Sequence, residues 1–410
     1  MVKKLLLIAG EPSGDHGGAY LVRALRQRLP SVDMFGVGGG DMQAAGLRLV
    51  HNITELSVIG LVEPIMHLPR LLRVRNDLLR HIAADQPDAV IFIDYPGFNL
   101  HLAKRIKRRW PHIPVIYFIS PQIWAYWHWR IHTIRRVVDL MLVMFPFEVD
   151  VYEKNGRFVT TPDGVRVDGP GWRRPAPLQV RCVGHWITAK IAQFRPDPAF
   201  LQRARIPEGR TVIAILAGSR HNEITSIFPV MLQAAERLRR AHPDLFFVIS
   251  CSRPALRPLL ETVIARAAIA HFDAAYRITD SAMYDVLHHA HIVIAKSGTS
   301  AFEAALFHKP VIVLYRINWF SALVLRLLAR SPFVNLANII AGRAIVPELL
   351  QEQMTPERVA SAVEAYLGDP ALYQRTVRAL EQVHDTLGHG EAGERAAGEI
   401  AAFLSARAAS

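Results

Sequence analysis

Three segments place glycines, hydroxyls and charged side chains directly after short apolar runs, where a buried strand would end. The first is AGEPSGDHGG at 9–18, which follows the apolar run at 5–8. A glycine-rich turn between a strand and a helix often binds a phosphate through its main-chain N–H groups. This turn carries two acids, Glu11 and Asp15, and no lysine, so its side chains would repel a phosphate. The residue types alone leave open what it binds.

The second segment, AILAGSRHNEI at 214–224, suits an anion better. Gly218 and Ser219 would let main-chain N–H groups approach an anion at the N-terminus of a helix. Arg220 adds a permanent positive charge beside them. A plain strand–helix turn with a surface arginine is the alternative at this point.

The third segment, HIVIAKSGTSAFEAALFHKPVIVLY at 291–315, ends a buried strand with hydroxyls and a glycine before a helix begins. Ser297, Gly298 and Thr299 therefore predict a second nest of main-chain donors for an anion. Because the turn at 218–220 lies in the same half of the chain, the pair favours a nucleotide.

Glu303 lies just inside the helix that follows this nest, where a carboxylate can accept hydrogen bonds from ribose hydroxyls. The spacing Ser300-x-x-Glu303 is also that of a capping box, in which Glu303 would only cap its helix. The two roles are compatible, and the sequence does not choose between them.

Asp94 ends the apolar run in AVIFIDYPGFN at 89–99. A carboxylate at the end of a buried strand is suited to act as a general base. An aspartate that starts a turn before Pro96 is an equally good interpretation of this residue alone.

Two further segments mix aromatic or leucine side chains with arginines. SPQIWAYWHWR at 120–130 holds three of the seven tryptophans of the chain. It favours a sugar or acyl pocket or a membrane interface, with core packing as the alternative. The segment at 64–82 predicts a basic amphipathic helix, which either packs one face on the core or lies on a membrane.

Motifs for metal-dependent or covalent chemistry are missing from the sequence. It contains no D-x-D pair, no H-E-x-x-H, no G-x-S-x-G elbow and no Walker lysine. A reaction that releases a phosphate would have to rely on arginine, a helix dipole and main-chain N–H groups. We therefore expect neither a metal nor another cofactor.

Short apolar runs alternate with helical stretches along the whole chain, which predicts parallel sheets covered on both faces. The pattern occurs twice, with a break near 184–200. We therefore expect an α/β protein of two Rossmann-like, doubly wound domains that face a central cleft, with ligands at the carboxyl ends of the strands. The expected strands are 4–9, 33–37, 88–94, 114–119, 139–144, 179–183, 211–217, 245–250, 291–295 and 310–315.

The predicted domains are 1–185, with a Gly-, Pro- and Arg-rich insert at about 155–178, and 186–365. Residues 366–410 are expected to form helices that return to the first domain or to a dimer partner. A length of 410 residues also favours two domains.

The composition is that of a globular protein with a net charge of +12 and only two cysteines, Cys182 and Cys251. The cysteine count excludes a disulfide framework and fits a reducing cytoplasm. The positive charge suits nucleic acid, an anionic membrane or phosphorylated small molecules. Because no nucleic-acid-binding motif is found, we expect no nucleic acid partner. No apolar run reaches the roughly 18 residues of a spanning helix.

A set of motifs occurs in order along the chain and resembles the lipid-A-disaccharide synthase family. They are AGEPSGD, GVGG with Met and Gly at 36–46, ELSVIGLVE at 55–63, IDYPGFN at 93–99, SPQIWAY at 120–126, FPFE at 145–148, VGH at 183–185, GSR with EI at 218–224, SGTSAFE at 297–303 and NLANIIAGR with VPELLQ at 335–351. This family consists of bacterial glycosyltransferases with the two-domain GT-B fold, and the resemblance covers nearly the whole chain.

The resemblance implies transfer of 2,3-diacylglucosamine from UDP to 2,3-diacylglucosamine 1-phosphate (lipid X), with inversion and release of UDP. It implies a step of lipid A and lipopolysaccharide biosynthesis in a Gram-negative bacterium, carried out in the cytoplasm on the inner leaflet of the cytoplasmic membrane by a peripheral enzyme. A homodimer is also implied. The alternatives are an isomerase similar to UDP-N-acetylglucosamine 2-epimerases and a non-catalytic lipid- or nucleotide-binding relative.

Carried over by motif, Asp94 would be the catalytic carboxylate and Arg220 an essential contact of the UDP phosphates. The remaining nucleotide contacts would be Gly218, Ser219, Ser297, Gly298, Thr299, Glu303, Asn338 and Arg343. The turn at 9–18 would then lie on the acceptor side and bind sugar hydroxyls, and the expected acceptor-side residues are Glu11, Ser13, Asp15, Trp124 and Arg130. Asp15 equally suits a helix N-terminus.

The chain departs from the family pattern in three places. The family usually has Arg or Gly after the sequence WAW, whereas this chain has the run from Tyr126 to Trp129 before Arg130. Trp186 stands where the family usually has a proline. The insert at 155–178 is also unusual. These changes flank the expected acceptor site and the break between the domains.

Overall fold

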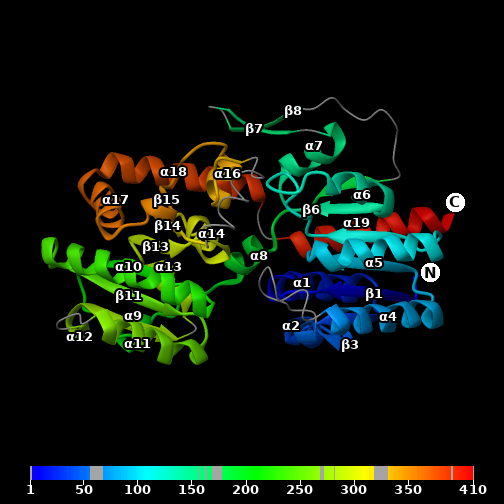
Figure 1. Cartoon of the computed structure of the whole chain (residues 1–410), viewed down its shortest axis with the longest axis horizontal. Helices are drawn as coiled ribbons and strands as arrows, with labels where there is room; N and C mark the ends of the chain where they lie inside the picture. Colours follow the sequence, from blue (N-terminus) through cyan, green and yellow to red (C-terminus); the bar gives the residue numbers. More distant parts are fainter. Residues whose placement is uncertain are drawn as a thin grey trace. The chain divides into compact units, whose positions relative to one another are not determined.

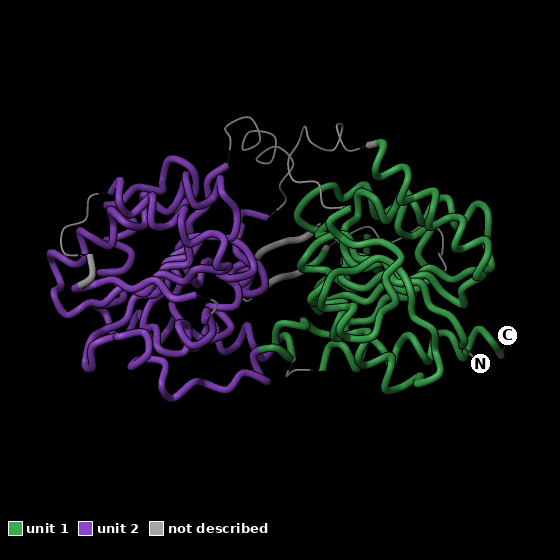
Figure 2. Tube along the Cα trace, turned by 90° about the horizontal axis from the view of Figure 1, so that it is seen from below, with its two compact units in different colours: residues 1–158, 167–190, 387–410 green, residues 159–166, 191–386 purple. Residues whose placement is uncertain are grey.

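The computed structural model describes residues 2–55, 68–155, 157–161, 164–168, 178–267, 272–280, 282–317, 331–388 and 391–409. Most of the motif at 55–63, the start of the segment at 64–82 and much of the insert at 155–178 lie outside these ranges. The chain forms two compact units. Unit 1 comprises 1–158, 167–190 and 387–410, and unit 2 comprises 159–166 and 191–386 (Figure 2).

Unit 1 is built on a seven-stranded parallel sheet with the order β3-β2-β1-β4-β5-β6-β9. Its inner strands are apolar on both faces, as expected for a sheet covered by helices on both sides. The strands are β1 (Lys4–Ala9), β2 (Asp33–Gly38), β3 (Arg48–Asn52), β4 (Ala89–Ile93), β5 (Val115–Phe118), β6 (Leu140–Val143) and β9 (Gln179–Cys182).

The helices of unit 1 follow the strands in the order expected for a doubly wound sheet. They are α1 (Pro12–Arg28), α2 (Gly40–Ala44), α4 (Leu68–Asp85), α5 (Pro96–Arg109), α6 (Arg130–Val137), α7 (Pro146–Lys154) and α19 (Ala392–Ala409). A two-stranded hairpin, β7 (Arg157–Thr161) with β8 (Gly164–Asp168), lies within the insert between α7 and β9. The helix α8 (Trp186–Gln193) carries the chain into unit 2.

Unit 2 repeats this architecture with a six-stranded parallel sheet in the order β12-β11-β10-β13-β14-β15 (Figure 1). Its strands are β10 (Thr211–Leu216), β11 (Leu245–Cys251), β12 (Tyr276–Asp280), β13 (Ile292–Lys296), β14 (Val311–Tyr315) and β15 (Glu348–Leu350). Its helices are α9 (Phe200–Arg203), α10 (His221–Ala241), α11 (Arg257–Ala267), α12 (Phe272–Ala275), α13 (Met283–His289), α14 (Thr299–Leu306), α16 (Leu336–Ala341), α17 (Pro356–Gly368) and α18 (Pro370–Leu387).

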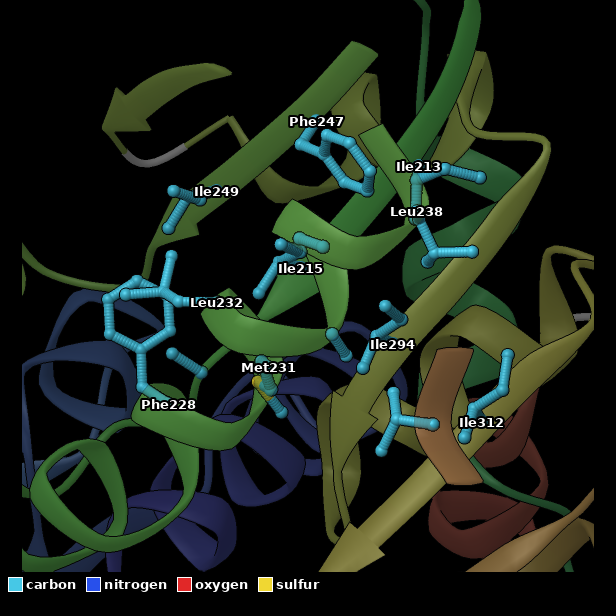
Figure 3. Close-up of a cluster of buried hydrophobic side chains, with 14 of the residues drawn as sticks. Ile213, Ile215, Phe228, Met231, Leu232, Leu238, Phe247, Ile249, Ile294 and Ile312 are labelled. Carbon is cyan, nitrogen blue, oxygen red and sulfur yellow. The ribbon is translucent and has the colours of Figure 1, made fainter. Parts of the chain in front are cut away.

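The core of unit 2 lies between α10 and the middle of its sheet (Figure 3). Phe228, Met231 and Leu232 repeat at helical spacing on one face of α10, and they pack on Ile215 and Ile294 of the central strands. All five side chains are fully buried, and each stabilises the unit by roughly 1.5–3 kcal/mol relative to exposure. This packing fixes α10, and therefore the loop before it, on the carboxyl end of β10.

The predicted fold class is confirmed, because both units are parallel sheets flanked by helices. Within the two parallel sheets, the strands β3, β12 and β15 are not among those expected from the sequence. β3 and β12 are edge strands with partly exposed residues, and β15 has three residues. Such strands lack the continuous apolar run that marks a buried strand.

The last two helices belong to different units. α18 is part of unit 2, whereas α19 is part of unit 1 and packs against α1. A Cβ on Gly393 would lie 2.8 Å from the main-chain oxygen of Tyr20, so the two helices touch backbone to backbone at this point. Ala396, Ala397 and Ile400 are fully buried along the same stretch of α19.

Candidate active-site residues and family

Asp94 lies immediately after β4, in a strained turn. Its φ is 49° and that of Tyr95 is 47°, so two consecutive residues that are not glycine adopt the left-handed conformation. Such residues cost on the order of 1–3 kcal/mol each and persist only where surrounding contacts hold them. This strain presents the Asp94 carboxyl at the carboxyl edge of the sheet, directly before α5.

Two side chains hold the strained turn by its main-chain oxygen. Asn99 donates from Nδ2 to the carbonyl of Asp94 at 2.8 Å, and the hydroxyl of Tyr117 donates to the same oxygen at 2.5 Å. Burial raises the pKa of Tyr117 well above its ordinary value, so the hydroxyl remains a donor at any physiological pH. Asn99 is fully buried. The orientation of Asp94 is therefore fixed by residues of α5 and β5.

The electrostatic environment of the Asp94 carboxyl favours its protonated form. Burial and the negative charge of Glu11 raise its pKa to about 7, although a hydrogen bond from the main chain of Tyr95 opposes the shift. The loop between β1 and α1 comes close to the same turn, because a Cβ on Gly10 would lie 2.2 Å from the ring of Tyr95. The structure thus brings Glu11 and Asp94 together. A carboxyl group with a pKa near 7 matches the requirement for a general base in neutral solution.

Asp15, in contrast, is buried and holds a neighbouring loop. Its carboxylate accepts hydrogen bonds from the main-chain N–H groups of Gly39, Asp41 and Met42 at 2.6, 3.1 and 3.1 Å. These donors lie at the start of α2, so Asp15 stabilises the N-terminus of a helix other than its own. Ser13 is half-buried in the first turn of α1. A direct contact of either residue with a sugar stays a prediction.

Trp124 belongs to the core of unit 1. Its ring is 1% exposed, it makes edge contacts with Phe145 and Phe147, and its indole N–H donates to Glu148 at 3.1 Å. Burial raises the pKa of Glu148 to about 7, even though N–H groups of Met144, Phe145 and Trp124 oppose the shift. Trp124 therefore positions the neighbouring loop through its packing, and any contact with an acceptor stays a prediction.

The later part of the same segment is exposed. Trp127 and Trp129 are 41% and 59% exposed, and the guanidinium of Arg130 lies 4.5 Å from the centre of the Trp127 ring. The segment at 120–130 thus divides into a buried half that packs and an exposed half that faces solvent. Trp186, a second departure from the family pattern, is buried against Gly17 and Tyr20 of α1.

In unit 2, the turns at 218–220 and 297–299 lie at the carboxyl ends of the neighbouring strands β10 and β13. Gly218 has a φ of 108° and Gly298 a φ of 147°, a region that favours glycine. Ser219 and Arg220 are exposed, as are Gly298 and Thr299, whereas Ser297 is buried and its N–H donates to the carbonyl of Leu314. The two turns expected to bind an anion are therefore brought together on one sheet edge.

Glu303 is buried on α14, and its Oε1 accepts a hydrogen bond from the hydroxyl of Tyr284 at 2.6 Å. The helix begins at Thr299 with Gly298 as its cap residue, so Ser300 lies inside the helix. The capping box considered from the sequence is therefore wrong for this helix end. A contact of Glu303 with ribose stays a prediction.

Asn338 is fully buried and makes four hydrogen bonds. Its Oδ1 accepts from the N–H groups of Ile345 and Val346, and its Nδ2 donates to the carbonyl of Val346 and to Glu348. It therefore holds the loop that contains Arg343, which is exposed. Glu348 was missed from the sequence. Its carboxylate accepts hydrogen bonds from the N–H groups of Val334 and Asn335, and burial raises its pKa.

Comparison with known proteins decides the family of the chain. The family model described as lipid-A-disaccharide synthetase matches residues 5–161 and 172–397. The chain belongs to the lipid-A-disaccharide synthase family. A lipid-A-disaccharide synthase from Anaeromyxobacter dehalogenans is 38% identical over 400 residues, which cover 98% of this chain and 97% of the relative. One from Geobacter sulfurreducens is 34% identical over 401 residues, with the same coverage.

Solved structures confirm the fold. The UDP-N-acetylglucosamine 2-epimerase from Neisseria meningitidis bound to UDP-GlcNAc superimposes with a TM-score of 0.64 at 12% identity, covering 97% of this chain and 99% of that one. A glycosyltransferase from Rickettsia africae superimposes with a TM-score of 0.56 at 11% identity, covering 98% of both chains. The epimerases thus share the fold at low identity, whereas the sequence relatives are synthases. The chain is therefore a glycosyltransferase of the lipid-A-disaccharide synthase family, and the epimerase alternative is not favoured.

Across the described ranges, no group of three or more His, Cys, Asp or Glu side chains is placed to hold a metal ion. Among the helices that the structure describes, none combines the length and apolar character that crossing a membrane requires.

Proposed function

We propose that the chain transfers 2,3-diacylglucosamine from UDP to the 6-hydroxyl of 2,3-diacylglucosamine 1-phosphate, and that Asp94 is the general base. The observation that carries the assignment is the environment of Asp94. Its carboxyl is held at a strand end by a strained turn, with a pKa of about 7. A base of this pKa accepts a proton from a sugar hydroxyl as that oxygen becomes the nucleophile.

The reaction balances as a single displacement. The acceptor oxygen forms a bond to C1 of the donor sugar while its proton passes to Asp94, and the bond from C1 to the β-phosphate oxygen breaks with its electrons on UDP. Attack from the face opposite the leaving group inverts C1. Because the product UDP gains negative charge, Arg220 and the N–H groups of the turns at 218–220 and 297–299 are proposed to stabilise it without a metal ion.

The acceptor and donor roles are proposed for residues of different units. Unit 1 supplies Asp94 and the acceptor-side residues Glu11 and Arg130, and unit 2 supplies the UDP site around Arg220. The support for this division is the position of each residue after a parallel strand of its own unit, which is where ligands bind in doubly wound sheets.

We further propose that unit 1 binds the surface of an anionic membrane, where acylated substrates would be found. Among the described residues, Leu72 of α4, Trp127 and Trp129 are large apolar side chains exposed to solvent. Arg70 and Arg73 are exposed near Leu72 in the sequence. Exposed tryptophans and basic amphipathic helices suit a membrane interface. We also propose that the chain forms a homodimer, as the family resemblance implies.

The direct test is mass spectrometry of the products from an acylated UDP donor and the phosphorylated acceptor. We expect a disaccharide 1-phosphate and UDP in equal amounts, also after treatment with a metal chelator. Conversion of UDP-N-acetylglucosamine alone to its manno epimer would instead support an isomerase. Binding of UDP without turnover of any acylated donor would support a non-catalytic relative.

A further inference from the structure

An ion pair between Lys296 and Glu223 joins the ends of two neighbouring strands in unit 2. Lys296 is the last residue of β13, and Glu223 lies in the first turn of α10, which follows β10. The Nζ of Lys296 lies 2.8 Å from Oε1 of Glu223, and the two side chains are only 17% and 14% exposed. The pair is thus mostly buried at the carboxyl edge of the sheet, and the functions proposed above do not use it.

The carboxylate of Glu223 lies inside the turn that carries Arg220. Its Oε2 accepts the N–H of Ser219 at 3.2 Å, and its Oε1 lies 3.5 Å from a guanidinium nitrogen of Arg220. A Cβ on Gly218 would lie 2.7 Å from Oε2, so the turn can wrap the carboxylate this closely only with glycine at that position. One negative group therefore contacts a main-chain donor and two cations.

The ammonium of Lys296 lies between the two turns expected to bind the nucleotide. It reaches Glu223 on one side. On the other side, it lies 3.5 Å from the point that a Cβ on Gly298 would occupy, and 5.8 Å from the centre of the Tyr315 ring. The other residues of β13, 292–295, are apolar and buried, so Lys296 is the one charged residue of this strand.

We infer that Lys296 is a second cation for the diphosphate of the sugar nucleotide, and that Glu223 is its internal counter-ion in the absence of nucleotide. The inference rests on the proposed UDP site around Arg220. A phosphate oxygen binds the same partners as this carboxylate, namely a main-chain N–H, a guanidinium and an ammonium group. The carboxylate thus keeps both cations in place until the diphosphate takes over their contacts.

The balance of charge explains why a diphosphate would replace Glu223 as the partner of the two cations. Lys296 and Arg220 carry two positive charges against one negative charge of Glu223, so the empty site has an excess of one positive charge. A diphosphate brings more negative charge than a carboxylate, and both cations move toward it. Glu223 then competes with the ligand electrostatically, even though it preorganises the cations.

Titration calorimetry with UDP and with uridine tests the inference. Lys296→Met should weaken UDP binding about 10- to 100-fold, as expected for the loss of a charged hydrogen bond, and should leave uridine binding unchanged because uridine has no phosphate. Lys296→Arg keeps the charge and should retain most of the affinity. Glu223→Gln keeps an acceptor for Ser219 but removes the competing charge, and UDP should bind about threefold more tightly.

Lys309→Met is the matched control, since Lys309 lies just before β14 at the other end of a strand and donates to the carbonyl of His288. It should leave UDP affinity unchanged. If Lys296→Met binds UDP as well as the unmodified chain does, or loses UDP and uridine binding equally, the pair is only structural and the inference is wrong. A weaker affinity of Glu223→Gln would also overturn the exchange. Failure of the unmodified chain to bind UDP would instead overturn the proposed function.

Discussion

The hydroxyl of Tyr117, in the middle of the sheet of unit 1, donates a 2.5 Å hydrogen bond to the main-chain oxygen of Asp94. It therefore fixes the backbone of the proposed base and leaves its carboxyl free to react. Tyr117→Phe should lower kcat about tenfold with little change in KM, because the loss of one buried hydrogen bond lets the strained turn relax. Steady-state kinetics would measure both constants.

A matched variant controls for packing. Tyr152→Phe removes another buried hydroxyl of unit 1, which bonds Ser120 instead of Asp94. It should lower the melting temperature without a comparable loss of kcat. Equal losses of kcat in both variants would show that Tyr117 acts through general stability.

The pH dependence of turnover follows from the pKa of about 7 for Asp94. A general base must be ionised, so kcat/KM should rise between pH 6 and pH 8. Glu11→Gln removes a negative charge that raises this pKa, and the acid limb of the profile should shift to lower pH. Asp94→Asn should reduce kcat about 10²- to 10⁴-fold at pH 8, where the carboxylate is ionised, and the difference from the unmodified chain should shrink as the pH falls below 7. A profile that falls between pH 6 and pH 8 would contradict the role of Asp94.

The raised pKa of Asp94 also makes the stability of the folded protein depend on pH. Because the pKa of Asp94 is higher in the folded protein than the ordinary value of an aspartate, ionisation favours the unfolded state. Its contribution to stability is therefore lost as the pH rises from about 4 toward 7. Asp94→Asn should lose less stability over this range than the unmodified chain, which thermal melts at several pH values would show.

Variants of Arg220 and Asp94 should distinguish nucleotide binding from the chemical step. Arg220→Ala should weaken UDP binding and also turnover, because a charged phosphate contact is lost in the ground state and the transition state. Asp94→Asn should leave UDP affinity nearly unchanged. Arg237→Ala is the control, as Arg237 is an exposed arginine of α10 paired with Glu357. If Asp94→Asn loses UDP affinity and Arg220→Ala keeps it, the assignment of donor and acceptor sides is reversed.

We expect Asn338 to contribute mainly to the stability of unit 2. Asn338→Ala removes four buried hydrogen bonds and should destabilise unit 2 by about 2–4 kcal/mol, which denaturant unfolding would measure. Asn222→Ala changes an exposed asparagine of the same unit and should have little effect. An unchanged unfolding curve of Asn338→Ala would contradict the structural role.

Membrane binding should depend on charge and on the exposed apolar side chains. Flotation with anionic vesicles should retain the chain at low salt and lose part of it at high salt, since each basic residue near the surface contributes on the order of 1 kcal/mol. Trp129→Ser should weaken retention more than Trp110→Phe, because Trp110 is buried. Equal partitioning onto neutral and anionic vesicles at every salt concentration would refute the electrostatic part.

The order of apolar runs and helical stretches along the chain is enough to predict the alternation of buried strands and helices, and with it the two parallel sheets. It also determined which charged residues follow a strand, because a continuous apolar run that ends in a polar residue is a local signal. The positions of Asp94 and Arg220 at strand ends were therefore predictable. Short or partly exposed strands such as β3 and β15 were not, since they carry no such run.

The contacts of each polar side chain depend on how the strands and helices pack in the folded protein. The carboxylate of Asp15 accepts hydrogen bonds from N–H groups 24 to 27 residues further along the chain, and Trp124 donates to Glu148 across 24 residues. Glu223 of α10 pairs with Lys296 at the end of β13. Nothing local marks such partners, because they meet only once parallel strands have aligned their carboxyl ends at one edge. The chemical types of the site residues are thus written in the sequence, whereas their pairing and their pKa values arise from packing and burial.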